Sequence, residues 1–325
     1  MNPPLDRSIF GLESYIHFQY RFDEFSALAV LCVLYTIPTF FVLLKMIHVY
    51  IKSKKHQTMR SLNPEVFRQF LIMQVLCLCH VVTKFTASRF PQTGLITAWC
   101  AAEKPQLVLK IVIYANYMII YSKYVAMILF CGLRVALMHS INFQQKTIRW
   151  FPMLTMVLIP CAFCLALPRL LAPTTCAQLG RPFPFGSVII MTFIEREARY
   201  RPIPTIIDVI VQPITLISIL LLNGLMLVKI HRINFVRKLT QQKSKSASET
   251  VLTTTMILII LPVVLNTIAC CYECFGDFHY LIYLIRPFSI DAQSHVITCY
   301  FYFTHPVFRP SNSKTVFVKA SSMML

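Results

Sequence analysis

The sequence has few charged residues and few glycines for its length. Only 14% of its 325 residues are Asp, Glu, Lys or Arg, whereas a typical soluble domain has about 25%. Its seven glycines are too few for a flexible linker or a collagen-like repeat. Hydrophobic residues make up 56% of the chain. Because so little polar material cannot coat a soluble protein of this size, the composition predicts a membrane protein.

Catalytic signatures are also missing. The sequence contains no GxSxG, no HExxH and no glycine-rich phosphate loop. Two CxxC spacings occur, at 161–164 inside an apolar segment and at 271–274 at the end of another. We interpret the first as buried small side chains and the second as a local disulfide or as having no role. We therefore expect no enzyme activity, no metal site and no cofactor.

The net charge of +18 is strongly basic, which in a soluble protein would suggest a nucleic-acid partner. Here the basic residues lie between apolar segments instead of on one amphipathic face or in one tail. We therefore expect no nucleic-acid partner.

Apolar segments long enough to cross a bilayer recur along the chain. A hydrocarbon core of about 30 Å needs around 20 apolar residues in a helix. The segments 25–44, 151–168, 209–228 and 251–272 contain no charged residue. The segments 66–83, 107–133 and 280–303 contain ionisable residues, but without them the loops would be long and very apolar. The sequence thus predicts an all-α membrane protein with a seven-transmembrane helix bundle.

The loops between these segments alternate in charge. The loop after the fifth segment has the largest basic cluster: Lys229, Arg232, Arg237, Lys238, Lys243 and Lys245. The loops of the opposite face have equal numbers of basic and acidic residues. The positive-inside rule then puts the N-terminus outside and the C-terminus in the cytoplasm. We expect an extracellular N-terminus over 1–24, which has no signal-peptide pattern, a transmembrane domain over 25–304 and a cytoplasmic tail over 305–325.

Two cysteines lie on the predicted outer face. Cys100 precedes the third segment, and Cys176 lies in the long loop 172–202. A disulfide persists on the oxidising side of a membrane, and a bridge between these two would hold the loop over the mouth of the bundle. Two free thiols, or pairing with Cys274, are the alternatives, because one sequence does not determine the connectivity.

The third segment carries a polar seam. At 100° per residue, five residues fall within about 80° of one another: Lys110, Tyr114, Tyr117, Tyr121 and Tyr124. The hydrocarbon of the bilayer provides no hydrogen-bond partners for these polar groups, so the seam should face the bundle interior. It either lines a ligand site or provides hydrogen bonds between helices. We favour hydrogen bonding for Tyr121 and Tyr124, and we keep both interpretations for the outer half of the seam.

Carboxylates inside the bundle need partners. Asp208 opens the fifth segment, with Gln212 one turn further on, and Lys110 is the cation at matching depth. This pair either is structural or contacts a ligand. In the seventh segment, we expect Arg286 and Asp291 to form an ion pair within the helix or with a neighbouring helix. The candidate ligand-binding residues are Lys110, Tyr114, Tyr117, Asp208 and Gln212.

Basic residues also mark the predicted cytoplasmic face. They bind either an acidic protein partner or anionic lipid headgroups. The candidates for a face that contacts a G protein are Arg134, Arg232, Arg237 and Lys238.

Four blocks carry a family resemblance: PQTGLITAWCA (91–101), CAQLGRPFPFGSVII (176–190), LIRPFSID (284–291) and FTHPVFR (303–309). In order and spacing they resemble blocks of the nematode serpentine receptors of class U, over about residues 25–310. The resemblance implies a seven-helix chemosensory receptor in the plasma membrane of sensory cilia, with a small-molecule ligand and a heterotrimeric G protein as partners. It also supports the pairing of Cys100 with Cys176.

The chain departs from the broader rhodopsin-like pattern. No acidic residue precedes Arg134, no Trp lies near Pro262, and Thr304-His305-Pro306 stands where Asn-Pro-x-x-Tyr is expected. No detailed activation mechanism therefore carries over. The alternative function is a seven-span transporter or channel, which internal repeats or an amphipathic pore helix would favour. We find neither.

Overall fold

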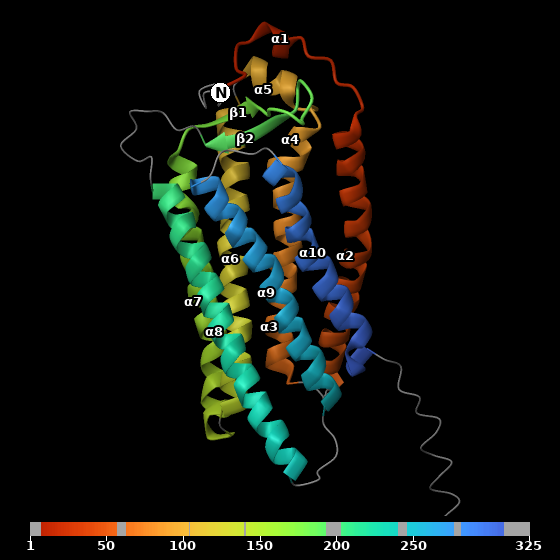
Figure 1. Cartoon of the computed structure of the whole chain (residues 1–325), viewed down its shortest axis with the longest axis vertical. Helices are drawn as coiled ribbons and strands as arrows, with labels where there is room; N and C mark the ends of the chain where they lie inside the picture. The colour runs from red at the N-terminus through yellow and green to blue at the C-terminus, as the bar shows by residue number, and fades with distance from the viewer. Residues whose placement is uncertain are drawn as a thin grey trace, which may run out of the picture.

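Long helices packed side by side form most of the molecule (Figure 1). The computed structural model describes residues 8–56, 63–103, 105–139, 141–192, 203–239, 246–275 and 281–308. The long helices are α2 (Glu24–His56), α3 (Pro64–Lys84), α6 (Gln106–His139), α7 (Ile141–Leu171), α8 (Ile203–Leu239), α9 (Ser246–Phe275) and α10 (Leu281–Thr304). Each predicted apolar segment falls in a different one of these helices, apart from Tyr280, which lies outside the described residues.

Five helical stretches among the described residues are long and apolar enough to cross a membrane. They are Glu24–Lys52, Pro64–Gln92, Gln106–Met138, Trp150–Leu171 and Ile206–Arg232. The outward faces of these helices carry exposed large apolar side chains, for example Phe41, Met156 and Leu221. Such faces are unfavourable in water and suit a lipid environment.

The helix α3 shows how local sequence sets an element. Asn63 caps it, since its side-chain oxygen accepts a hydrogen bond of 2.9 Å from the Glu65 amide, and Pro64 takes the first helical position, where no amide donor is needed. At its far end α3 continues into a π-helical turn, η1 (Phe85–Arg89), and the short α4 (Phe90–Gln92). A π turn accommodates one more residue than an α turn.

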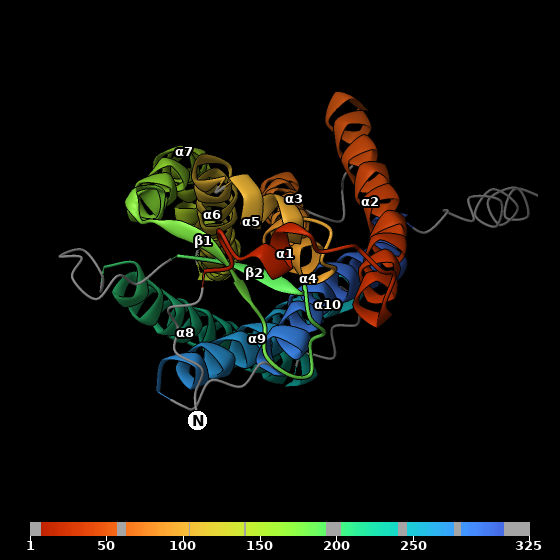
Figure 2. The same ribbon diagram turned by 90° about the horizontal axis from the view of Figure 1, so that it is seen from above.

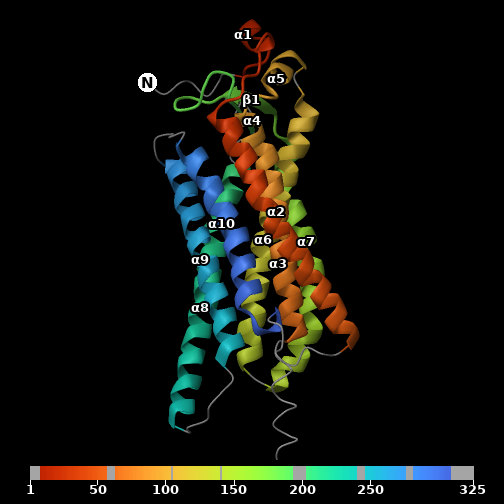
Figure 3. The same cartoon turned by 90° about the vertical axis from the view of Figure 1, so that its right-hand side faces the viewer.

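A cap of short elements covers one end of the bundle (Figures 1 and 3). It contains α1 (Glu13–Ile16), α5 (Thr97–Glu103) and a hairpin of β1 (Thr174–Gln178) and β2 (Val188–Thr192). The strands are antiparallel, with Cys176 opposite Ile190. This hairpin departs from the predicted all-α fold, because a long loop that lies across a bundle must pair its own backbone groups.

The cap is tied to the bundle at several points. A disulfide joins Cys100 of α5 to Cys176 of β1, with 2.13 Å between the sulfurs. The N-terminal segment adds a bond of 3.1 Å from the Ile9 amide to the Cys176 carbonyl. Gly186 has φ +93°, and a Cβ there would lie 2.1 Å from the Phe18 ring. This turn therefore requires glycine both for its backbone conformation and for space.

An aromatic core fills the opposite end of the bundle. Phe70 of α3 and Phe301 of α10 lie 4.1 Å apart between ring centroids, and both are fully buried. His305, just after α10, stacks on Phe301 at 4.8 Å and is also fully buried. The chain then turns through η2 (Pro306–Phe308). These rings hold α3 and α10 together.

Candidate functional site: a pocket beneath the hairpin

A small cavity lies under the hairpin, between η1, α6 and β2. Its volume is about 150 Å³, which is below the roughly 300–1,000 Å³ of pockets for drug-sized ligands. From above, β2 crosses the end of the bundle near α6 (Figure 2), and residues 189–192 of this strand line the cavity. The polar residues that line the cavity are Lys84, Ser88, Asn116, Tyr117 and Thr192. We call it the outer pocket.

Asn116 gives the outer pocket a hydrogen-bond acceptor. Its side chain is 4% exposed, and its Oδ1 has no hydrogen-bond partner among the described residues. Leaving such an atom unsatisfied costs about 1–3 kcal/mol. A ligand of a few heavy atoms that donates a hydrogen bond would satisfy it.

A buried ion pair adjoins the outer pocket. Arg169, at the end of α7, pairs with Asp208 of α8. Tyr121 of α6 donates a 2.6 Å hydrogen bond to the same carboxylate. The guanidinium carbon of Arg169 also lies 4.0 Å from the ring centroid of Tyr117, and its Nη1 donates to Thr192 Oγ1 at 3.2 Å. The group thus links a pocket residue and the hairpin to α6, α7 and α8.

The expected pairing of Lys110 with Asp208 is wrong. The structure pairs Asp208 with Arg169 instead. The planar guanidinium reaches the carboxylate, the Tyr117 ring and Thr192 at once, which a single ammonium group cannot do. Lys110 is half-buried near the N-terminal end of α6.

The residues of the polar seam on α6 make different contacts according to their position along the helix. Tyr117 lines the outer pocket, and Tyr114 packs against the main hydrophobic core. Tyr124 accepts a 2.9 Å hydrogen bond from Asn266 of α9, which also donates to Gln212 of α8 at 3.4 Å. Gln212 and the inner tyrosines therefore make hydrogen bonds between helices, and of the five ligand-binding candidates only Tyr117 reaches the outer pocket.

A second buried ion pair joins the other side of the bundle. Arg89, in the π turn η1, lies 2.5 Å from Asp291 of α10 between charged atoms. Tyr35 of α2 donates to the same carboxylate and accepts a 3.0 Å bond from Arg89. Asp291 thus has the neighbouring-helix ion pair that we expected, although its partner is Arg89; the side chain of Arg286 lies outside the described residues.

A third polar group lies deeper in the bundle. The ammonium group of Lys123 lies 3.1 Å from Nδ1 of His80 and 3.4 Å from Oε1 of Gln293. Lys123 is 3% exposed. It joins α6 to α3 and α10 and is, with Lys110, one of the two lysines that interrupt the third apolar segment in the sequence.

Sequence reasoning missed Arg89 and Arg169 as interior residues. Arg169 directly follows the apolar segment 151–168, and Arg89 lies six residues beyond the segment 66–83, so the sequence pattern assigns both to loops of the predicted outer face. The available signal was that each stands at the end of a helix, where a long side chain can either reach the interface or turn back into the bundle.

The basic candidates of the inner face are only partly described. Arg134 is 4% exposed in the half of α6 away from the hairpin, so it is buried in this conformation. Arg232 is exposed on α8. Arg237 and Lys238 belong to α8, but their side chains lie outside the described residues. No group of three or more metal-ligating side chains occurs in the described part of the chain.

Comparison with known proteins gives the family of this chain. A family model described as "Serpentine type 7TM GPCR chemoreceptor Sru" matches residues 9–311. The chain belongs to this serpentine receptor family. It is also similar to "Serpentine receptor class U-26" of Caenorhabditis elegans, with 27% identity over 187 residues.

The match to that nematode protein is partial. It covers 56% of this chain and 62% of the relative, so the chain spans less than two thirds of the relative's length. Membership in the serpentine family makes the chain a multi-pass membrane protein of a receptor family and not of an enzyme family. The predicted class U family is confirmed.

Proposed function

We propose that this serpentine family member is a chemosensory G-protein-coupled receptor. Its ligand is a small molecule that binds in the outer pocket, and its partner is a heterotrimeric G protein at the opposite end of the bundle. The family match supports the receptor class. The observation that carries the ligand site is the buried, unpartnered Oδ1 of Asn116 in a cavity beneath the hairpin.

The proposed topology has seven crossings, with the capped end outside. The long helices α2, α3, α6, α7, α8, α9 and α10 would each cross once, and the seven-helix family description supports that number. The disulfide supports placing the cap on the oxidising side. Plasma membrane of sensory cilia is the proposed location. Epitope tags at the two ends should become accessible on opposite sides of intact cells; the same side for both would exclude this topology.

The ion pair of Arg169 and Asp208 supports a route between the two ends. It connects Tyr117 in the outer pocket to α8, which continues to the basic residues Arg232, Arg237 and Lys238. A ligand that displaces Tyr117 changes the surroundings of Arg169 and so favours one position of α8 over another. An inner cleft beside α8 and α9 would then admit the G protein.

The experiment measures nucleotide exchange on a G protein by the purified receptor during a screen of small polar molecules. For an active compound, Asn116→Leu should raise the half-maximal concentration by about tenfold or more, because one buried hydrogen bond is lost. Leu95→Ala, at an exposed position outside the lining of the pocket, serves as the matched control. Substrate flux through liposomes without nucleotide exchange would favour a transporter instead.

A further inference from the structure

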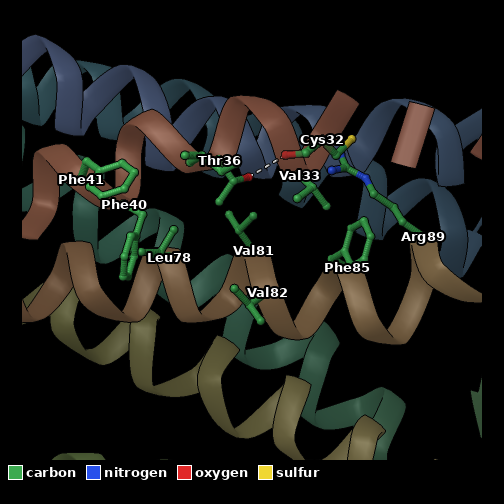
Figure 4. Close-up of a pocket in the computed structure, with 11 residues that line it drawn as sticks. Cys32, Val33, Thr36, Phe40, Phe41, Leu78, Val81, Val82, Phe85 and Arg89 are labelled. Atoms are coloured by element: carbon green, nitrogen blue, oxygen red, sulfur yellow. Dashed lines mark hydrogen bonds between the residues drawn. The ribbon is translucent and has the colours of Figure 1, made fainter. Parts of the chain in front are cut away.

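A second cavity, unrelated to the outer pocket, lies between α2 and α3. Its volume is about 430 Å³. Its walls are almost entirely apolar, with Phe40, Phe41 and Leu78 toward one end (Figure 4). Cys32 and Arg89 lie at the other end. We call it the α2–α3 groove.

The groove opens toward lipid and not toward water. Val33, Phe41 and Val82 line it, and they are 47%, 62% and 54% exposed. They lie within two of the stretches that are long and apolar enough to cross a membrane. From above, α2 stands at the edge of the bundle (Figure 2). A molecule dissolved in the bilayer can therefore enter sideways.

The polar end of the groove holds a hydrogen-bond donor that nothing in the described chain uses. Arg89 is 6% exposed, and its Nη1 bonds Asp291 and Tyr35. Its Nη2 has no hydrogen-bond partner among the described residues. Figure 4 shows the side chain reaching across the groove toward Cys32. A buried N–H without an acceptor is costly, so an oxygen of a ligand placed there stabilises the site.

The charges around Arg89 decide which oxygen fits. The guanidinium is already neutralised by Asp291 at 2.5 Å. A second carboxylate on the same guanidinium would be repelled by Asp291 and would also lose its hydration in the membrane. An alcohol, ketone or ester oxygen accepts the hydrogen bond without repulsion from Asp291 and without the loss of a charged group's hydration. The site therefore favours an uncharged head.

The length of the groove sets the size of the tail. From Cys32 to Phe41, α2 rises about 14 Å at 1.5 Å per residue. Because bonds of about 1.5 Å zigzag, an extended hydrocarbon chain advances only about 1.3 Å per bond, so roughly ten carbons together with the head oxygen span that distance. We propose that the α2–α3 groove binds an uncharged single-chain amphiphile of about this length, whose oxygen accepts from Arg89 and whose tail runs toward Phe41. This inference rests on the groove alone and not on G-protein coupling.

Photolabelling of the purified full-length protein in nanodiscs tests the proposal. The probe is a decanol with a diazirine midway along its chain, and labelled peptides are mapped by mass spectrometry. We expect labels within 33–41 and 78–85. Unlabelled 1-decanol should compete at about tenfold lower membrane concentration than decane or decanoate, because only the alcohol gains the hydrogen bond without charge repulsion. Equal competition by decane, or stronger competition by decanoate, would overturn the proposal.

A pair of variants separates the groove from general lipid contact. Val33→Trp fills the groove and should reduce labelling about tenfold. Val30→Trp makes the same change on α2 at a residue that is 51% exposed but outside the groove, and it should leave labelling unchanged. Equal labelling of the two variants contradicts the proposal. Val82→Trp replaces Val33→Trp if the latter is not monodisperse.

A bilayer lipid is the other possible occupant, and a second probe distinguishes it. Phosphatidylcholine with a diazirine in one acyl chain is used in the same nanodiscs. If the amphiphile occupies the groove, 1-decanol should displace this label from 33–41. If the label persists at saturating 1-decanol, an acyl chain of the bilayer fills the groove and the proposal fails.

Discussion

The two buried ion pairs at the capped half of the bundle are built alike but are connected differently. Arg89 with Asp291 and Arg169 with Asp208 each combine one guanidinium, one carboxylate and one tyrosine hydroxyl. Arg169 also stacks on an aromatic ring and bonds the hairpin. Arg89 also faces a ring, that of Phe288, whose centroid lies 5.1 Å from the guanidinium carbon. Its Nη2, however, has no hydrogen-bond partner in the described chain, and the residue lines an apolar groove.

The two ion pairs therefore combine the same chemical groups but have different roles in the bundle. The Arg89 pair holds the peripheral helix α2 to α10 through Tyr35, and it leaves one donor available to a molecule from the bilayer. The Arg169 pair connects the hairpin and Tyr117 to α8. The first pair is therefore the better candidate for a structural clasp, and the second for a connection between ligand and inner face.

Removing a carboxylate should have the largest effect, and it should be larger at Asp291. Asp291→Leu leaves Arg89 buried and uncompensated, which costs about 3–5 kcal/mol. Asp208→Leu should cost less, because the Asp208 side chain is 14% exposed and that of Asp291 is 6% exposed, and because the Tyr117 ring lies closer to Arg169, at 4.0 Å, than the Phe288 ring lies to Arg89, at 5.1 Å. Thermal melts of the detergent-solubilised variants measure both. Arg89→Met in the Asp291→Leu background should recover part of the loss; no recovery, or a larger loss at Asp208, would reverse the comparison.

Breaking the disulfide should loosen the surroundings of the Arg169 ion pair and leave those of the Arg89 ion pair unchanged. Replacing Cys100 and Cys176 by Ser removes a cross-link between residues 76 positions apart, for which about 2–4 kcal/mol is typical. Hydrogen exchange should then rise in β2, which carries the Thr192 contact to Arg169. The contact between α2 and α10 should stay protected. Equal exchange in both regions would mean that the cap supports the whole bundle.

Protonation of His305, at the end of the bundle opposite the cap, should change stability without affecting either buried ion pair. Burial of His305 lowers its pKa from 6.5 to about 4. The folded protein holds this imidazole neutral while the unfolded chain protonates it, so the stabilisation is complete above about pH 6.5 and is lost as the pH falls toward 4. The loss should be about 2–3 kcal/mol. Thermal melts from pH 7.5 to 4.5 should show it, and His305→Gln should flatten the profile.

The smallest expected effect is that of the ring beneath Arg169. Tyr117→Leu removes a cation–π contact, for which about 1 kcal/mol is typical, and should lower thermal stability only slightly. For a ligand of the outer pocket, the same variant should weaken the response more than the stability, whereas Phe in place of Tyr117 should retain the ring contact. A wild-type response of Tyr117→Leu would remove this residue from the ligand site.

Much of the fold was predictable because the bilayer imposes it. Apolar segments of the right length locate the helices, and the seam angle correctly placed Tyr121 and Tyr124 in hydrogen bonds between helices. These predictions need only the period of a helix. The family resemblance added the receptor family, which the comparison confirms.

The partners of the buried charges were not predictable in the same way. Arg89 and Arg169 lie beyond the end of an apolar segment, and the sequence does not say whether such a side chain turns outward or inward. The choice of Arg169 over Lys110 for Asp208 depends on which helices are neighbours and on the place of Thr192 in the hairpin. Since packing between distant segments decides both, single-segment patterns contain no signal for them.

The wide turn η1 sets the direction in which Arg89 points. If the same residues of the Phe85–Arg89 stretch continued α3 as an ordinary α-helix, the one residue that the π turn absorbs would rotate everything beyond it by about 100°. Arg89 would then leave Asp291, and α4 would no longer meet β2. A relative with a one-residue gap here should therefore lack the π turn and still present the equivalent of Arg89 to α10, because an α turn of one residue fewer covers nearly the same angle.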